Sequence, residues 1–269
     1  MCKAIPLEIL SIMENKNDRP LVSFIVTTYN LPTTLLCECL QSILSLSLSK
    51  EEREIIVVDD GSEVSPLNDL VELRDKIVYV RQRNKGLSEA RNMGLVCAQG
   101  KFIQFVDGDD YLIQAPYEHC LDIARYKDAD IILFHETEEE QPEVPFECNG
   151  PMTGSAYMHQ YNLRASACGY LFRANILGNL RFTPNLLHED EEFTPQLFLR
   201  AEHMYFTPSK AYYYRQRSGS ITQEDNMRHM AKRLDDTESI ILRLPGSAHH
   251  SPVKGPHPRP RPTAPRTPA

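Results

Sequence analysis

The sequence predicts an α/β fold built on a mostly parallel sheet. Through the first 135 residues, short apolar runs alternate with segments of helical spacing. The runs are apolar on both faces, as strands are when helices cover both sides of a sheet. Strand–helix–strand repetition over this length indicates right-handed crossovers. A composition of 41% hydrophobic and 25% charged residues in 269 positions is that of a globular protein.

The first half of the chain is expected to contain strands at residues 21–28, 54–58, 77–80, 101–106 and 130–134. Between the first two strands, Leu36, Leu40 and Ile43 keep helical spacing. A second helix is expected between the third and fourth strands, with Leu87 and Gly94 on one face. Because glycine has no side chain, Gly94 should let this helix approach the sheet closely.

The second half is less regular. Residues 136–152 are polar and broken by prolines, which predicts a surface loop. Beyond it the expected elements are strands at 169–173, 204–207 and 211–215 and helices at 189–201 and 223–243. Residues 245–269 hold eight prolines and no large aliphatic side chain beyond Val253. This tail cannot bury enough apolar surface to fold, so we expect it to be disordered.

Charge and cysteine content restrict the class of protein. The formal net charge is −8, and the tail carries only basic charge, so the body is more acidic still and a poor binder of nucleic acid. The seven cysteines include no Cys-x-x-Cys pair, which argues against a zinc site or a disulfide framework and for reduced thiols in a cytoplasmic protein. We expect no signal peptide and no transmembrane helix. Peripheral contact with the inner face of a membrane stays open.

A cluster of carboxylates follows the strand expected at 101–106. Asp107, Asp109 and Asp110 lie within four positions, and Asp107 and Asp109 share one side if the extended conformation continues. Gly108 between them should allow a ligand close to the backbone. A hard divalent cation is the usual reason for such a cluster, and an EF-hand fits poorly because no ligand or glycine follows at the required positions. An acidic turn is the simpler alternative.

Polar clusters also end the other predicted strands: Thr27-Thr-Tyr-Asn30, Asp59-Asp-Gly-Ser62 and Asn84-Lys-Gly-Leu-Ser-Glu-Ala-Arg-Asn92. Each alone is explained by a turn and a helix cap. Together they must meet at one edge of the sheet, where ligands of α/β proteins bind. Tyrosine and carboxylates suit a nucleobase and ribose, and Arg91 suits phosphate.

The segments 22–30, 56–62, 84–94 and 105–110, in this order and spacing, resemble the motifs of family-2 glycosyltransferases. The resemblance covers about residues 20–225. It implies the GT-A fold, a Rossmann-like sheet sandwiched by helices, with acceptor-side elements in the second half. We therefore divide the chain into an N-terminal extension (1–19), a glycosyltransferase domain (20–244) and the tail (245–269). Within the domain, 20–135 would bind the nucleotide-sugar and 153–244 the acceptor.

The resemblance also implies roles for residues. The implied donor-binding residues are Thr27, Tyr29, Asp60, Asn84, Arg91, Asn92, Asp107, Asp109, Arg217 and Ser220. Among them, Thr27, Tyr29 and Asp60 would hold the uridine. Asp107 would face the ribose or the sugar, and Asp109 would bind Mg²⁺ or Mn²⁺.

The segment 188–193 reads as an acidic helix start, which the helix dipole favours. By resemblance it supplies the catalytic base, with Asp190 the matching residue and Glu189 the next choice. The later segment 214–222 resembles a loop that closes over the diphosphate, to which Arg215, Arg217 and Ser220 would contribute.

The implied enzyme is a metal-dependent, inverting glycosyltransferase that moves one sugar from a nucleotide-sugar, usually a UDP-sugar, to a hydroxyl of a glycan or lipid-linked acceptor. The chain has no tryptophan and no Gln-x-x-Arg-Trp motif, which favours a non-processive enzyme of bacterial polysaccharide or glycolipid synthesis. Two alternatives stay open. A nucleotidyltransferase would normally carry a glycine- and lysine-rich phosphate loop where Thr-Thr-Tyr-Asn stands here. An inactive sugar-nucleotide-binding protein is the non-enzyme alternative.

Overall fold

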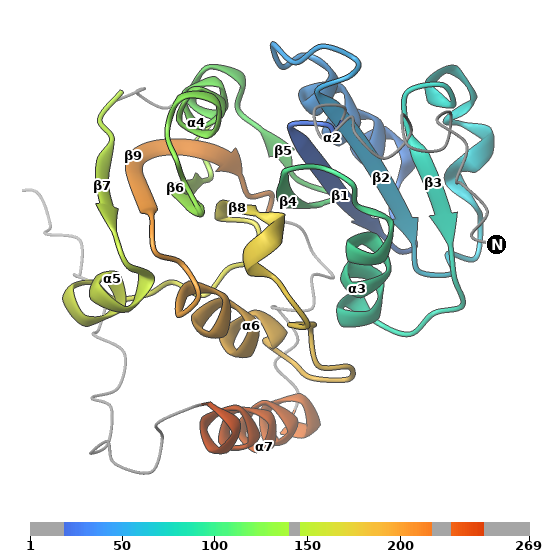
Figure 1. Cartoon of the computed structure of the whole chain (residues 1–269). Helices are drawn as coiled ribbons and strands as arrows, with labels where there is room; N and C mark the ends of the chain where they lie inside the picture. Colours follow the sequence, from blue (N-terminus) through green and yellow to red (C-terminus); the bar gives the residue numbers. More distant parts are fainter. Residues whose placement is uncertain (1–18, 140–145, 217–226, 245–269) are drawn as a thin grey trace, which may run out of the picture.

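The computed structural model describes residues 19–139, 146–216 and 227–244. A single nine-stranded sheet runs through this part of the chain in the order β3-β2-β1-β4-β8-β6-β9-β5, with β7 paired to β9 (Figure 1). The predicted α/β fold is confirmed. The terminal segments 1–18 and 245–269, which include the predicted tail, lie outside the described residues.

Four parallel strands form the first half of the sheet. They are β1 (Val22–Thr28), β2 (Arg53–Asp59), β3 (Val78–Arg81) and β4 (Phe102–Asp107). β1 lies between β2 and β4, and all seven of its residues are buried, as the apolar pattern on both faces predicted. Because the strands are parallel, their carboxyl ends meet at one edge of the sheet.

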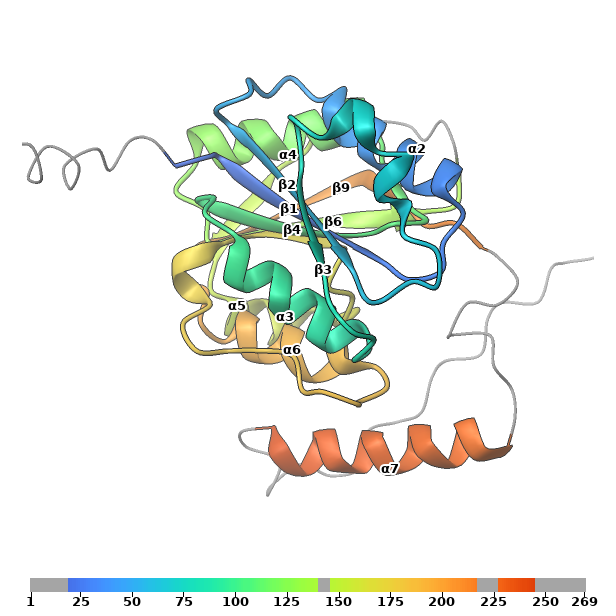
Figure 2. The same cartoon turned by 90° about the vertical axis from the view of Figure 1, so that its right-hand side faces the viewer.

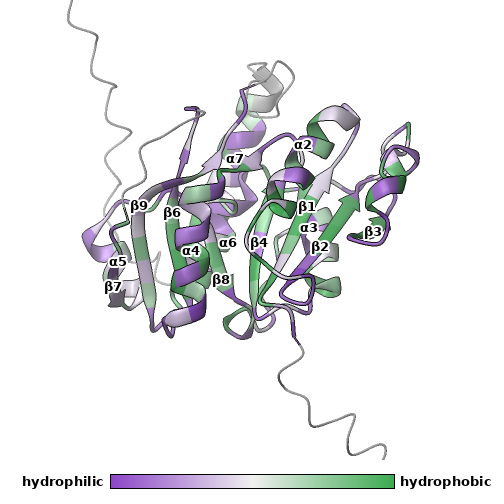
Figure 3. Ribbon diagram, turned by 90° about the horizontal axis from the view of Figure 1, so that it is seen from above, coloured by the Kyte–Doolittle hydropathy of each residue, from purple (hydrophilic) through white to green (hydrophobic). Residues whose placement is uncertain are grey.

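Helices cover both faces of this sheet. Figure 2 shows α2 (Thr33–Leu44) and α4 (Gln114–Tyr126) on one side and α3 (Leu87–Cys97) on the other. A Cβ atom on Gly94 of α3 would come within 2.2 Å of Cγ2 of Ile25, so the glycine does allow the close approach that was predicted. α4 had no counterpart among the predicted elements. The strands are mostly hydrophobic, whereas α4 also carries hydrophilic stretches (Figure 3).

The second half of the chain extends the sheet with both directions of pairing. β8 (Tyr170–Arg173) is antiparallel to β4 and to β6 (Ile131–Thr137), and β9 (Met204–Tyr213) is parallel to β6. The prediction of separate strands at 204–207 and 211–215 was wrong, because β9 continues through Pro208 with register shifts against β6. β5 (Tyr111–Leu112) pairs with the end of β9.

The predicted loop at 136–152 is shorter than expected. β6 continues to Thr137, and β7 (Asn149–Met152) adds an edge strand to β9. Three short 3₁₀ turns complete the described part of the chain: Pro66–Asn68, Val71–Leu73 and Ala174–Ile176.

Three helices flank the second half of the sheet: α5 (Gly154–Gln160), α6 (Glu189–Phe198) and α7 (Met227–Arg243). α7 lies on the α6 side of the body (Figures 1 and 2). Arg243 of α7 pairs with Glu192 of α6 at 3.2 Å, and Asp236 accepts the Leu187 N–H at 2.8 Å. No helix in the ranges 19–139, 146–216 and 227–244 is long and apolar enough to cross a membrane.

Candidate functional site

A cleft of about 490 Å³ opens where β4 ends and α3 and α6 begin. The charged residues that line it are Arg91, Asp107, Asp110, Glu136, Arg164, Glu189, Asp190 and Lys232. A larger hollow of about 980 Å³ lies at the opposite edge, beside Leu21 and Phe102 at the amino ends of β1 and β4. Ligands of α/β sheets bind beyond the carboxyl ends of the strands, so the smaller cleft is the candidate site.

Asp107 ends β4 and faces this cleft. Its Oδ1 lies 3.0 Å from Nη2 of Arg91 and 3.4 Å from Oγ1 of Thr27. Its backbone N–H donates to the hydroxyl of Tyr212 at 3.1 Å. The carboxylate is thus held between β1 and α3 and the backbone by β9, while a third of the side chain surface remains exposed.

The chain turns immediately after Asp107, and the extended conformation does not continue. The N–H of Asp110 donates to the carbonyl of Asp107 at 2.9 Å, so Asp109 lies on a turn and the premise of a shared side fails. A Cβ atom on Gly108 would come within 2.8 Å of the carbonyl oxygen of Thr27. The glycine is therefore required by packing against β1.

Asp110 belongs to the same cluster, and no motif assigned it a role. It is buried, and its carboxylate accepts from the hydroxyl of Tyr212 and the N–H of Arg215, both at 2.8 Å. Burial, with the charges of Asp107 and Asp109, raises the pKa of Asp110 to about 8. Its contacts tie the end of β9 to the turn after β4, so it shapes the site from behind.

Asp60 follows β2 and holds the loop that leads into α3. Its carboxylate accepts from Nε2 of Gln82 at 2.7 Å and from the N–H groups of Lys85 and Gly86 at 2.9 and 2.8 Å. Asn84, in the same loop, is exposed. Asp60 is buried, and these hydrogen bonds hold the loop in place.

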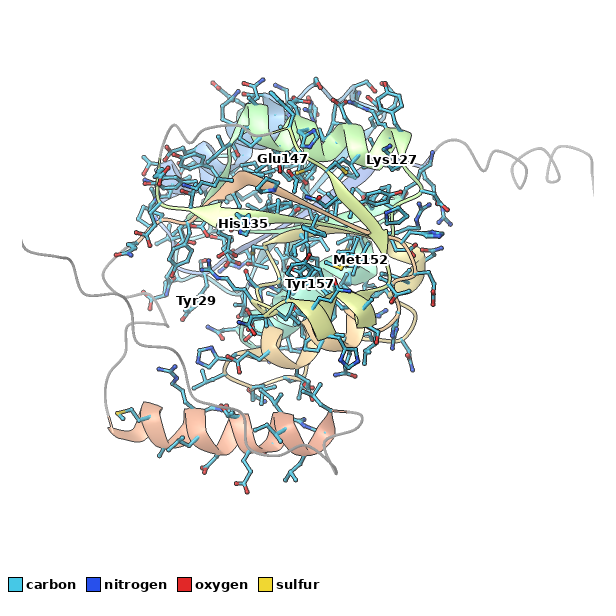
Figure 4. All side chains as sticks on the ribbon, turned by 90° about the vertical axis from the view of Figure 1, so that its left-hand side faces the viewer. Tyr29, Lys127, His135, Glu147, Met152 and Tyr157 are labelled. Carbon is cyan, nitrogen blue, oxygen red and sulfur yellow. The ribbon has the colours of Figure 1, made fainter. Side chains whose placement is uncertain are left out.

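Tyr29 lies at the edge of the body with 48% of its surface exposed (Figure 4). The next residue, Asn30, is in the left-handed region (φ 46°) and its N–H donates to Oγ of Ser62 at 2.9 Å. The ends of β1 and β2 are therefore joined, and the ring of Tyr29 is available for stacking on a base.

Arg91 and Asn92 both contact residues of the second half of the chain. Arg91 is buried, and its Nη1 lies 2.6 Å from Oε1 of Glu189. Asn92 does not line the cleft: its amide donates to the carbonyl of Phe182 and accepts from the N–H of the same residue, both at 2.9 Å. Asn92 thus anchors the segment before α6. The prediction placed Asn92 in the donor pocket, but its amide is directed to the backbone of Phe182.

Two neighbouring carboxylates at the start of α6 differ in their surroundings. Glu189 is buried against Arg91, whereas Asp190 is partly buried in the cleft. Burial, followed by the negative charge of Glu189, raises the pKa of Asp190 to about 7. A carboxylate with a pKa near neutrality suits general-base work at physiological pH. Before them His188 adopts the left-handed conformation (φ 58°) as the helix begins.

The structure therefore brings together Arg91, Asp107 and Asp190 in one cleft, with Thr27 in contact with Asp107. Tyr29, Asp60 and Asn84 lie along the neighbouring strand ends, outside the lining of that cleft. Arg217 and Ser220 lie outside the described residues.

Glu136, Arg164 and Lys232 also line the cleft, and sequence reasoning missed them. Arg164 pairs with Glu136 at 2.9 Å. They come from three separate segments that carry no motif, and Glu136 stands in the stretch that was predicted to be a loop. Only the three-dimensional path of β6 and α7 brings them to the site.

The turn after β4 suits a divalent cation that binds together with a diphosphate. In the part of the chain that the structure describes, no three histidine, cysteine or carboxylate side chains are grouped to hold an ion by themselves. Mg²⁺ is often held by one or two carboxylates together with phosphate oxygens of the substrate. Asp109 does not line the cleft, but it lies on the turn between Asp107 and Asp110, which do, and it would be the carboxylate of such a shared site.

Comparisons with known proteins agree with this geometry. Residues 23–151 match the model of glycosyl transferase family 2. The uncharacterized glycosyltransferase EpsJ of Bacillus subtilis is 31% identical over 76% of this chain and 63% of its own length. The poly(ribitol-phosphate) beta-glucosyltransferase of Bacillus spizizenii is 29% identical over 72% of this chain and 32% of its own length. The chain thus spans less than two thirds of either relative.

Among solved structures, S. aureus TarS (residues 1–349) in complex with UDP-GlcNAc superposes with a TM-score of 0.66 and 24% identity. The similarity covers 82% of this chain and 65% of the TarS chain. This likeness concerns the fold, and it supports the GT-A arrangement that the motifs predicted.

Proposed function

Because the chain belongs to glycosyl transferase family 2, we propose that it moves one sugar from a nucleotide-sugar to a hydroxyl group, with inversion at the anomeric carbon. One observation carries this proposal: the same cleft contains a carboxylate held in place by Arg91 and a second carboxylate whose pKa is near 7. These are Asp107 on β4 and Asp190 on α6. They come from the two halves of the chain, as a donor side and an acceptor side require.

The donor is proposed to be a UDP-sugar. The base would stack on Tyr29, whose ring is exposed, above the loop that Asp60 holds. The carboxylate of Asp107 is partly exposed, and it would accept a hydrogen bond from a hydroxyl of the ribose or the sugar. UDP-GlcNAc, the ligand of the structurally similar TarS, is the first donor to test.

Asp109 is proposed to hold Mg²⁺ or Mn²⁺ jointly with the donor diphosphate. When bound, the cation would supply the positive charge that stabilises a departing nucleoside diphosphate. Asp107 and Asp110, on either side, would keep the turn in place through their contacts with Arg91 and Tyr212.

Asp190 is proposed as the general base. It would take the proton of the acceptor hydroxyl as the oxygen attacks the anomeric carbon from the face opposite the diphosphate. Glu189 is less suited, because its carboxylate is buried and already paired with Arg91 at 2.6 Å. One displacement completes the reaction, so no covalent nucleophile is needed.

The acceptor is proposed to be a hydroxyl-bearing glycan or a lipid-linked glycan of a cell-surface polymer. This proposal is supported by the relative from Bacillus spizizenii, which is named for transfer to poly(ribitol-phosphate). Glu136, Arg164 and Lys232 line the same cleft and would face the acceptor. Contact with a membrane surface would follow only for the lipid-linked acceptor.

The direct test is to incubate the protein with UDP-GlcNAc, UDP-glucose, UDP-galactose and GDP-mannose and to follow release of the nucleoside diphosphate, with Mn²⁺ or with EDTA. Metal-dependent release from one donor is expected. Binding of a donor, seen as a rise in melting temperature, without any release would instead identify a sugar-nucleotide-binding protein. No response to any of the four would contradict the proposed function.

A further inference from the structure

Arg91 is the centre of a buried chain of charges that joins the two halves of the molecule. Its Nη2 lies 3.0 Å from Oδ1 of Asp107 at the end of β4, and its Nη1 lies 2.6 Å from Oε1 of Glu189 in the first turn of α6. Only 4% of Arg91 is exposed. The guanidinium therefore connects the donor-side carboxylate to the helix that carries Asp190.

Aromatic rings fix the position of this guanidinium. Cζ of Arg91 lies 5.4 Å from the ring centre of Phe182 and 5.9 Å from that of Phe105. Its Nε is a buried atom with no hydrogen-bond partner among the described residues. Because separating a buried ion pair leaves an uncompensated charge, Arg91 and Glu189 should hold each other in place.

This pairing decides which carboxylate of α6 faces the acceptor. Successive residues of a helix point about 100° apart. With Glu189 directed toward Arg91, the rotation of the first turn is fixed, and Asp190 is directed into a different part of the cleft.

We propose that Arg91 and Glu189 are positioning residues for Asp190: their ion pair occupies Glu189 and fixes the first turn of α6, so that the neighbouring carboxylate is the one presented to the acceptor hydroxyl. The inference rests on the proposed function in that Asp190 is taken as the base. The same pair also acts on Asp190 through its charge.

Several groups act on the ionisation of Asp190. Burial and the charges of Glu189 and Glu191 raise its pKa, and the charge of Arg91 lowers it. The hydroxyl of Tyr170 on β8 is also near enough to interact electrostatically. His188 and Lys232 line the same cleft. Removing the charge of Glu189 should therefore lower the pKa of Asp190, and removing that of Arg91 should raise it.

The ionisation of Asp190 can be measured without a substrate. Its pKa in the folded protein is raised, so the ionised form destabilises the fold. The Asp190→Asn variant should therefore melt at a higher temperature than the wild type. This difference should grow as the pH rises above about 4, the pKa of an aspartate in the unfolded chain, and should level off near the pKa of Asp190 in the folded protein. Repeating the comparison in a Glu189→Gln background should move the pH at which this difference levels off to a lower value.

Glu191→Gln is the matched control. Glu191 lies in the same turn but is exposed, so its removal should shift the levelling less than Glu189→Gln does. Equal shifts for the two variants, or no shift for Glu189→Gln, would overturn the inference. Neither outcome depends on knowing the donor.

Transfer assays separate this inference from the proposed function. Glu189→Asp keeps the charge but shortens the side chain, so we expect kcat to fall while the donor KM and the pH of the acid limb stay unchanged. A Glu189→Asp enzyme with the kcat of the wild type would overturn the positioning role. Glu189→Gln that is dead while Asp190→Asn is active would make Glu189 the base and overturn it as well.

Discussion

Glu189 and Asp190 are adjacent in the sequence, yet their carboxylates have different surroundings. The first is neutralised by a buried arginine, and the second lies in a cleft where burial and the first carboxylate raise its pKa to about 7. An ionised carboxylate in that environment is a stronger base than one in water, because its conjugate acid has the higher pKa. In the proposed mechanism, Glu189 would therefore position the helix start and Asp190 would accept the proton.

The pH dependence of transfer follows from this environment. The base must be ionised to act, so kcat/KM should rise tenfold per pH unit below the pKa of Asp190 and level off near pH 7. The measurement is kcat/KM between pH 5 and pH 9 at saturating Mn²⁺. An acid limb near pH 4, the ordinary range of an aspartate, would show that Asp190 is not the group that limits the rate.

Asp109 is expected to be needed for activity and not for folding. It lies on the turn after β4, partly buried, outside the apolar core. Asp109→Ala should abolish transfer and weaken UDP binding in the presence of Mn²⁺, with a melting temperature close to that of the wild type. UDP binding by calorimetry, with and without EDTA, gives the measurement. Full activity in EDTA would contradict the metal role.

Sequence reasoning at this scale found the residues that motifs carry and missed those that only folding brings near. Asp107, Arg91 and Asp190 were identified from the order of motifs, and all three line the cleft. Asn92 belongs to the same motif, yet its amide pairs with the backbone of Phe182, a partner 90 residues away that no local pattern reveals.

At the scale of elements, α3 is packed unusually close to the sheet. Gly94 lies against Ile25 of β1, which is completely buried, and α3 begins at the loop that Asp60 holds. Arg91 lies one turn before Gly94 on this helix. The distance between α3 and the sheet therefore determines how far the guanidinium of Arg91 reaches toward Glu189.

Gly94→Ala should destabilise the fold by about 1–3 kcal/mol, because the added methyl group overlaps Ile25 in a closed core. The loss would occur although alanine favours helix formation by about 1 kcal/mol over glycine. Urea denaturation measures it. Val96→Ala, an exposed site on the same helix, is the control and should change the stability by no more than about 0.5 kcal/mol. Equal effects at both sites would mean that α3 is not packed as described.

Elements were predictable where one pattern dominated. The four parallel strands could be predicted, because each is a short apolar run that ends in a polar cluster. α4 was missed, although Tyr117, Cys120, Leu121 and Ala124 keep helical spacing and are buried. β9 was divided in two because Pro208 and Ser209 resemble a turn. In the structure, register shifts against β6 accommodate this stretch within the strand.

Across the molecule, the candidate cleft depends on the packing of two halves whose strands pair in different ways. The first half is a parallel sheet whose strand ends converge by topology alone. The second half reverses direction at β8, which is antiparallel to both β4 and β6. The sequence could not predict this arrangement, because pairing between distant strands leaves no local signal. Arg91 joins the halves through its contacts with Asp107 and Glu189.

The most direct measurement is the transfer rate of Asp190→Asn beside that of the wild type, together with the affinity of each for the donor. Asparagine keeps the size of the side chain and removes the base. We expect kcat to fall by about 10²-fold or more, with the dissociation constant of the donor unchanged, since Asp190 is proposed to act on the acceptor. An Asp190→Asn variant that transfers sugar at the wild-type rate would show that Asp190 is not the general base.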